Sequence, residues 1–423
     1  MQSQKTSPST PLRLACAAAI LVATAASATD VDASITGLMQ VRPTIVNAED
    51  RSYVPFIALI GLRVADQNVW KLDEVRAELG AWGRLSVLSL GDNAADVDLA
   101  YVGIKAFDKH LAVNLGRQFV TGGAVRAMQL DGLSATVTIP GNVGLSAFGG
   151  VPVIPRFALA RGSATWGGRL FWRPTWETEI GASYFELWDR PEFTTGASEV
   201  SRRDVGLDFR TFLFSHLSLS GLGVFSVPET RFSELTLNAR VMLPAEFEIT
   251  GAFRHTSPDL FLPRTSIFAV FAETNRTEGA LGLDWNGHAW SAGVDGRVIG
   301  FEDGLGYEVT GVVGFRPGRN TRTSLQVIRL ADPGNAYTRA RLAARHSIGQ
   351  LTLAADVDGA LFDNPINGRT VALQGQLTAK LGLPANFDVL VSGLAATDPL
   401  FTQRFEVLAR LVYTFQLHTG GAR

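Results

Sequence analysis

The 423-residue sequence contains a single cysteine, Cys16, and it lies inside an N-terminal leader segment. The mature chain therefore has no thiol, which excludes a disulfide framework, a thiolate metal site and cysteine catalysis. The six histidines add no alternative, because none has a partner at metal-ligand spacing. We therefore expect the protein to hold no metal and no cofactor and to have no catalytic residue. On this basis we do not expect it to be an enzyme.

The sequence also has few charges and no long apolar run. Charged residues make up 18% of the chain, against about 25% in typical soluble domains. After the leader, no stretch approaches the roughly 18 apolar residues that a transmembrane helix needs, which excludes a helical membrane protein. The net charge of −2 gives no general attraction to nucleic acid. Lysine occurs at only five positions, so 38 − 5 = 33 of the basic residues are arginine.

The first 28 residues have the layout of a secretory signal peptide. Lys5 and Arg13 precede the apolar run Leu14–Ala26, and small residues up to Ala28 provide a cleavage site. We therefore expect an exported protein with a signal peptide at 1–28. No linker or composition shift divides the remainder, so 29–423 is predicted to be one domain.

That domain is dominated by period-two alternation in segments of about ten residues. In Val371–Leu383, apolar or small side chains occupy the odd positions and mostly polar ones the even positions, and Phe405–Leu417 repeats the pattern. Alternation places every second side chain on one face of a sheet. The fold class is predicted to be all-β, a single transmembrane antiparallel β-barrel of 18–22 strands, with about 22 as the direct count.

Two features distinguish a membrane barrel from a soluble sandwich, which would alternate in the same way. Aromatic residues mark the ends of the apolar face, where rings sit at the headgroup level of a bilayer: Trp166, Trp172, Trp285, Trp290, Tyr413 and Phe415. The other face carries charges in mid-strand, which would be costly in a dry core but not in a water-filled lumen. We predict an outer-membrane protein of a Gram-negative bacterium, in contact with outer-membrane lipid, with both termini in the periplasm.

Short connections alternate with longer ones, as in outer-membrane barrels. The longer connections are predicted at Val120–Met128, Gly150–Ala160, Asp189–Val200, Thr256–Asn275 and Asp363–Arg369. We expect the loops at 150–160 and 256–276 to fold inward and narrow the lumen, since the second contains many apolar residues.

The alternation also selects the candidate pore-lining residues. The basic set is Arg76, Arg84, Arg169, Arg210, Arg240, Arg254, Arg297, Arg339, Arg341, Arg345 and Arg410, and the acidic set is Glu74, Asp208, Asp295, Asp356 and Asp358. They could form ion pairs that stiffen the barrel, or a selectivity lining that binds anionic groups of a passing solute. Arg339, Arg341 and Arg345 have the fewest acids nearby in sequence and are the candidate anion-attracting stripe.

A second candidate feature is a hairpin in which Arg117, Arg126 and Asp131 would gather at the rim as a loop clamp. The strand with Gly116-Arg117-Gln118, a loop, and then Asp131-Gly132 resembles the corresponding hairpin of alginate-export-type porins. The resemblance implies a conduit of roughly 18 strands for anionic polysaccharide, working with a periplasmic or inner-membrane export apparatus. The acidic cluster that follows this motif in that family is replaced here by Val120-Thr121-Gly122-Gly123.

The leading functional hypothesis is therefore a channel that passes hydrophilic solute, most specifically one that exports anionic polysaccharide. The alternatives are a general diffusion porin and a sealed structural or adhesion barrel. A third class, an outer-membrane hydrolase, would need His255 and Ser257 to pair as base and nucleophile.

Overall fold

The computed structural model describes residues 29–46, 49–67, 69, 71–86, 93–153, 163–189, 199–260, 275–301, 304–399 and 403–418. The expected signal peptide at 1–28 lies outside these residues. Within the described ranges, no helix has both the length and the apolar character to cross a membrane.

The described chain consists of 23 β-strands and two three-residue 3-10 helices. The first twelve strands are β1 (Thr29–Val46), β2 (Glu49–Tyr53), β3 (Pro55–Gln67), β4 (Leu72–Ser86), β5 (Ala94–Ala106), β6 (Leu111–Gly122), β7 (Val125–Ile139), β8 (Val143–Pro152), β9 (Ala164–Thr175), β10 (Thr178–Asp189), β11 (Glu199–Leu213) and β12 (Leu217–Ser226). The remainder are β13 (Arg231–Leu243), η1 (Pro244–Glu246), β14 (Phe247–Thr256), η2 (Pro258–Leu260), β15 (Arg276–Asn286), β16 (Trp290–Phe301), β17 (Gly304–Gly318), β18 (Thr321–Ala331), β19 (Ala336–Ile348), β20 (Leu351–Ile366), β21 (Arg369–Leu383), β22 (Phe387–Thr397) and β23 (Arg404–His418).

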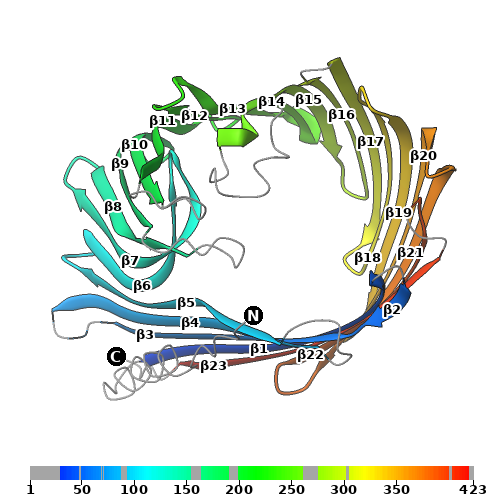
Figure 1. The fold of residues 1–423 in the computed structure, drawn as a ribbon, viewed down its shortest axis with the longest axis horizontal. Coiled ribbons are helices and arrows are strands. Elements are labelled where there is room, and N and C mark those ends of the chain that lie inside the picture. Colours follow the sequence, from blue (N-terminus) through cyan, green and yellow to red (C-terminus); the bar gives the residue numbers. More distant parts are fainter. Residues whose placement is uncertain are drawn as a thin grey trace.

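The sheet closes on itself into a ring (Figure 1). From β3 to β23 each strand pairs antiparallel with the next, and β1 pairs with β2, β3 and β23, so that Asp30 lies opposite His418. Strands β2 and β3 are separated only by Val54 and pair with β1 in one continuous register, so together they form one strand of the barrel. The barrel therefore has 22 strands, which confirms the direct count. The 18 strands implied by the family resemblance are wrong for this chain.

The two faces of the sheet differ as the alternation predicts. In β21, Val371, Leu373, Leu377 and Leu381 are all well exposed on the outside of the barrel. Gln376 and Thr378 point the other way and hydrogen-bond to Ser392 of the neighbouring strand. A wide band of exposed apolar side chains around a closed sheet is what a bilayer requires, since lipid cannot satisfy a free strand edge.

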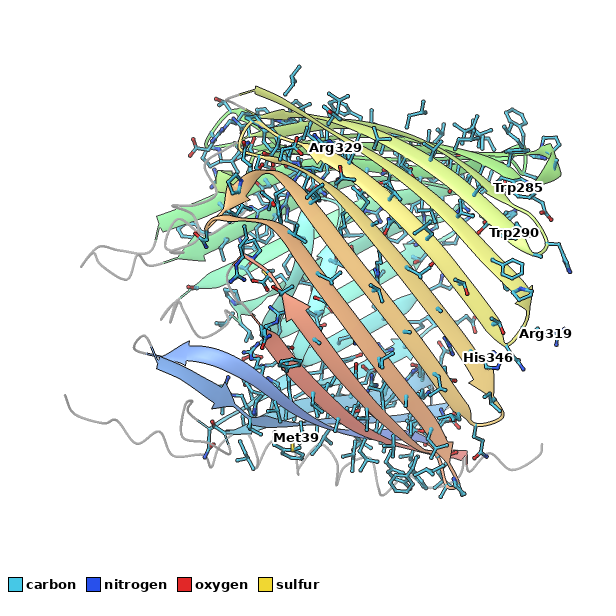
Figure 2. All side chains as sticks on the ribbon, turned by 90° about the vertical axis from the view of Figure 1, so that its right-hand side faces the viewer. Met39, Trp285, Trp290, Arg319, Arg329 and His346 are labelled. Atoms are coloured by element: carbon cyan, nitrogen blue, oxygen red, sulfur yellow. The ribbon has the colours of Figure 1, made fainter. Side chains whose placement is uncertain are left out.

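Aromatic rings gather at the ends of this outer band. Figure 2 shows Trp285, Trp290, Arg319 and His346 at one end of the barrel and Arg329 at the other. The first end is also where β1 begins and β23 ends, and we call it the terminal end. Short turns join the strands there, and the Trp290 and Phe315 rings pack with centroids 4.4 Å apart. Rings at this level suit the boundary between lipid and water.

Two predicted long connections are in fact strand. β6 runs to Gly122 and β7 starts at Val125, so a two-residue turn replaces the loop expected at Val120–Met128. β20 and β21 likewise extend to Ile366 and from Arg369, in place of the loop expected at Asp363–Arg369. Glycines and polar residues in these stretches suggested loops, but cross-strand hydrogen bonds hold them in the ladder. Residues 154–162, 190–198 and 261–274, the main parts of the other predicted loops, lie outside the described residues.

A charge placed on the outer face should destabilise the barrel far more than one placed on the inner face. Leu377 is 70% exposed on the outside, in the middle of β21. Arginine at the lipid midplane costs about 2–4 kcal/mol, so Leu377→Arg should lower the free energy of unfolding in lipid vesicles by that amount. Gln374→Arg, on the same strand but facing inward, is the control and should change it little. Equal losses for the two variants would contradict the assignment of the two faces.

Candidate functional site

The candidate site is the inner wall of the barrel. The strand register places every predicted pore-lining residue on the face opposite the exposed apolar side chains. Many of these charges form ion pairs between neighbouring strands. Examples are Lys105 with Glu74 at 2.7 Å and Arg240 with Glu248 at 2.6 Å.

The densest group of charges surrounds Glu179 on β10. Its carboxylate accepts hydrogen bonds from Arg169 at 2.7 Å, Arg173 at 2.6 Å and Arg210 at 3.0 Å. Arg169 also donates two hydrogen bonds to Asp208, at 3.0 and 2.5 Å. This group of charges joins β9, β10 and β11. The Glu179 side chain is only 9% exposed, so its buried charge depends on the arginines for compensation.

The three arginines of the predicted anion-attracting stripe differ in whether they have an acidic partner. Arg341 donates hydrogen bonds to both oxygens of Asp356, and Arg339 pairs with Asp358. These acids lie on the adjacent strand β20 and are distant in sequence, so the pairing could not be predicted from neighbouring residues. Among the described residues, no carboxylate forms an ion pair with Arg345 or with Arg410.

The Gly-Arg-Gln and Asp-Gly motifs form the base of the hairpin β6–β7. Gly116 lies opposite Gly132, and Arg117 lies opposite Asp131. Gly116 has φ of +124°, and a Cβ on Gly132 would lie 2.2 Å from the carbonyl oxygen of Gly149. Only glycine fits at these two positions. Gly116 and Gly132 therefore allow the backbone of the hairpin to leave the barrel wall. Arg117 clamps the two strands here through hydrogen bonds of 2.7 and 2.8 Å to Asp131.

Beyond this base, the tip of the hairpin docks on the inner wall of β10 and β11. The Ala124 amide donates a 2.6 Å hydrogen bond to the Ser183 hydroxyl. Gly123 has φ of +58°, and a Cβ there would lie 2.2 Å from Ser183 Oγ. On the other side of the contact, a Cβ on Gly206 would lie 2.8 Å from the Ala124 Cβ. The tip and the wall therefore fit without spare space.

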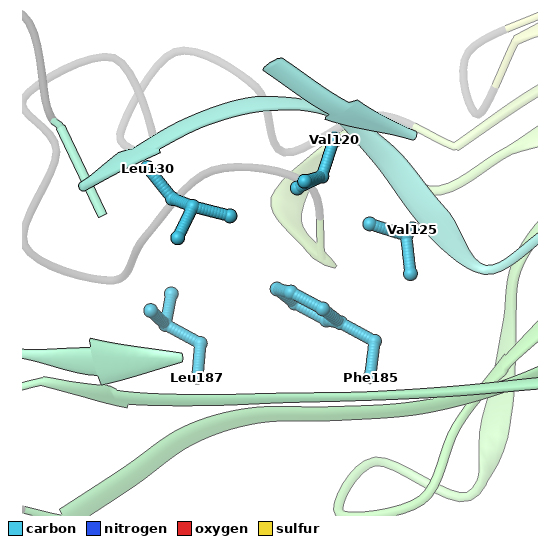
Figure 3. Close-up of a cluster of buried hydrophobic side chains, with 5 residues drawn as sticks. All are labelled: Val120, Val125, Leu130, Phe185 and Leu187. Carbon is cyan, nitrogen blue, oxygen red and sulfur yellow. The ribbon is translucent and has the colours of Figure 1, made fainter. Parts of the chain in front are cut away.

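Apolar side chains fill the space between the hairpin and the wall. Figure 3 shows Val120, Val125 and Leu130 of the hairpin facing Phe185 and Leu187 of β10. All five are buried, and Leu130 is fully so. This is a small hydrophobic core inside the barrel, and it holds the hairpin in the lumen.

Arg126 corrects the predicted loop clamp. Arg117 and Asp131 meet as expected, but Arg126 reaches across to β13 and pairs with Glu234 at 2.5 Å. It belongs to the docking contact because the hairpin turns inward, and no local pattern in the sequence indicates that turn. The clamp of three residues is therefore wrong, and Arg126 has a separate partner.

The residues considered for catalysis do not pair. The Ser257 hydroxyl donates to the Phe232 carbonyl oxygen at 3.2 Å, and His255 Nδ1 contacts the Thr277 hydroxyl at 2.8 Å. In the part of the chain that the structure describes, no group of three or more histidine, cysteine or acidic residues could hold a metal ion.

The important residues missed from the sequence include Glu179, Glu234 and Ser183. Alternation alone would place Glu179 and Ser183 on the inner face of β10, together with Phe185. No sequence signal, however, indicates that a hairpin from another part of the ring covers Ser183. Arg322, opposite Arg345, was also missed, although its alternation with Leu325 and Val327 places it inward.

A closed barrel of this size, apolar outside and charged inside, has the architecture of an outer-membrane porin. No protein-family model matches the chain, and no curated protein matches it significantly. The P pilus usher (PapC) translocation pore aligns with a TM-score of 0.51 and 8% identity, over 92% of this chain and 100% of that one. At this identity the likeness extends to the fold alone.

Two proteins of Pseudomonas aeruginosa align over a similar length. The outer-membrane protein OpdK has a TM-score of 0.48 and 8% identity, over 92% of this chain and 99% of its own. OccK2 (OpdF) has a TM-score of 0.47 and 9% identity, over 92% of this chain and 98% of its own.

Proposed function

We propose that this protein is an outer-membrane channel for hydrophilic solutes. One observation supports this above all: charged side chains line the inner wall of β15–β23 and remain accessible to water. The side chains of Arg339 and Arg341 are 39% and 48% exposed even within their ion pairs. Charges in a dry interior would be strongly unfavourable, so a continuous aqueous lumen is the arrangement that suits them.

We infer the orientation in the membrane from the lengths of the connections. Outer-membrane barrels have short periplasmic turns and longer external loops. We therefore place the terminal end in the periplasm and the base of hairpin β6–β7 towards the outside. The apolar outer band contacts lipid, and the docked hairpin narrows the external half of the lumen.

Anionic polysaccharide is the most specific solute we propose, moving outward from an export apparatus in the periplasm or inner membrane. Two features support it: the Gly-Arg-Gln and Asp-Gly motifs at the base of the hairpin, and the inward residues Arg345 and Arg410, which have no acidic partner among the residues that the structure describes. Block of the channel by oligogalacturonate but not by maltotriose is the expected result. Equal block by both sugars would favour a general diffusion porin.

Conduction itself can be tested with the mature chain, residues 29–423, refolded into planar bilayers. We expect stepwise conductance, and swelling of proteoliposomes in small neutral sugars. Heat-denatured protein serves as the control.

A second candidate is a sealed structural barrel, which the docked hairpin favours because it fills part of the lumen. Folded protein that inserts into bilayers, resists proteolysis and passes no current would establish this second candidate and reject the channel.

A further inference from the structure

Two arginines face each other on neighbouring strands near the terminal end. Arg322 on β18 and Arg345 on β19 are direct register partners, and both line the same depression in the wall. Directly opposite residues in an antiparallel pair have Cβ atoms about 4.5–5.5 Å apart, and like charges at this spacing are destabilising. Such a pair needs a counter-charge.

The protein supplies no counter-charge within the described residues. No carboxylate there forms an ion pair with Arg322 or Arg345. Asp356 lines the same depression, but both of its oxygens already accept hydrogen bonds from Arg341, at 3.1, 2.8 and 2.6 Å. The neighbouring arginines on β19 are thus neutralised, whereas this pair keeps its positive charge.

The pair opens onto a depression in the inner wall whose lining is partly polar. The depression has a volume of about 310 Å³. Arg345 lies opposite Ala354 on β20, and Ala354 in turn lies opposite Thr378 on β21. The short alanine leaves space between the guanidinium groups on one side and the threonine hydroxyl on the other. Guanidinium groups bind oxyanions through paired hydrogen bonds. The Thr378 hydroxyl can add a further one if it accepts, rather than donates, in its 2.9 Å contact with the Ser392 hydroxyl.

We propose that Arg322 and Arg345 form an oxyanion-binding site at the terminal-end mouth of the lumen. Its ligand is the carboxylate or sulfate group of an acidic sugar, held between the two guanidinium groups with its ring over Ala354. The inference deepens the proposed function and rests on it, because it places the first recognition of an anionic solute at the periplasmic entrance.

The test compares the wild type with Arg322→Gln/Arg345→Gln. Trigalacturonate should block the wild-type channel, and the double substitution should weaken that block by about tenfold, the effect of losing charge-assisted hydrogen bonds. Maltotriose, which carries no charge, should act equally on both. Arg319→Gln removes one positive charge from the turn at the same end, outside the depression, and should leave the block unchanged.

Calorimetric titration of trigalacturonate and of sulfate into the folded protein in detergent separates this proposal from the proposed function. Binding that is lost in the double variant supports the site even if the barrel passes no current. Should the double variant fail to fold, Arg345→Gln alone decides, with a smaller loss expected. Unchanged affinity in the folded variants, or an equal loss in Arg319→Gln, would overturn the site whether or not the wild type conducts.

Discussion

Replacing Gly206 with valine is expected to release hairpin β6–β7 and raise the single-channel conductance. A Cβ at this position would lie 2.8 Å from the Ala124 Cβ and 2.9 Å from the Ala124 amide nitrogen, so the docked tip could not stay in place. Overpacking costs about 1–3 kcal/mol, which corresponds to a shift of about 5- to 150-fold in the docking equilibrium. Conductance in planar bilayers is the measurement.

Two further variants make this prediction decisive. Gly251→Val introduces the same side chain where nothing lies within 4 Å of the Cβ, and it should conduct like the wild type. Arg126→Ala removes the 2.5 Å ion pair to Glu234 without adding bulk, so it should increase conductance even if Gly206→Val fails to fold. If Arg126→Ala and a folded Gly206→Val both conduct like the wild type, the hairpin does not limit the pathway.

Replacing Glu179 with glutamine should cause the largest loss of stability among inner-wall substitutions. Three arginines share this one buried carboxylate. Arg169 keeps its hydrogen bonds to Asp208, and Arg173 and Arg210 are 47% and 69% exposed, so the cost is that of the lost charge-assisted hydrogen bonds, about 1.5–3 kcal/mol. We expect the free energy of unfolding in vesicles to fall by about that amount. The released guanidinium groups should also increase the preference of the channel for anions.

Asp363→Asn is the matched control for this substitution. Asp363 accepts hydrogen bonds of 2.8 and 2.5 Å from Arg329, but it is 45% exposed at the opposite end of the barrel. An exposed pair contributes about 0–1 kcal/mol, so this variant should unfold almost like the wild type. Similar losses for Glu179→Gln and Asp363→Asn would show that the charges around Glu179 do not depend on one another.

The two faces of the sheet could be predicted because they depend on neighbouring residues alone. Successive side chains of a strand point to opposite sides, so Val371–Leu383 and Phe405–Leu417 revealed their outer faces without any tertiary information. The 22-strand count followed from the alternation of short and longer connections between such segments.

The partners of the lumen charges could not be predicted in this way. Arg341 is 15 residues from Asp356, and Arg126 is 108 residues from Glu234. Which acid faces which arginine depends on the register between strands, and a shift of one residue would turn each side chain to the other face. Arg339, Arg341 and Arg345 therefore looked alike in sequence, although they differ in charge balance.

The inward turn of hairpin β6–β7 was hidden for a related reason. Gly122 and Gly123 suggested a loop, as glycines between alternating segments usually do. Their small size instead serves close packing against Ser183 and Arg169, which belong to strands further along the ring.

The sequence by itself determined that this protein is a closed β-barrel with an apolar outside, a charged inside and aromatic residues at both ends. The two faces repeat every second residue, and closure is expected because lipid cannot satisfy a free strand edge, so neither inference needs knowledge of distant contacts. Only the tertiary structure decided which arginines are neutralised and which segment occupies the lumen. Both depend on side chains that meet across the ring, and the free energy of those contacts is set by register and packing rather than by local pattern.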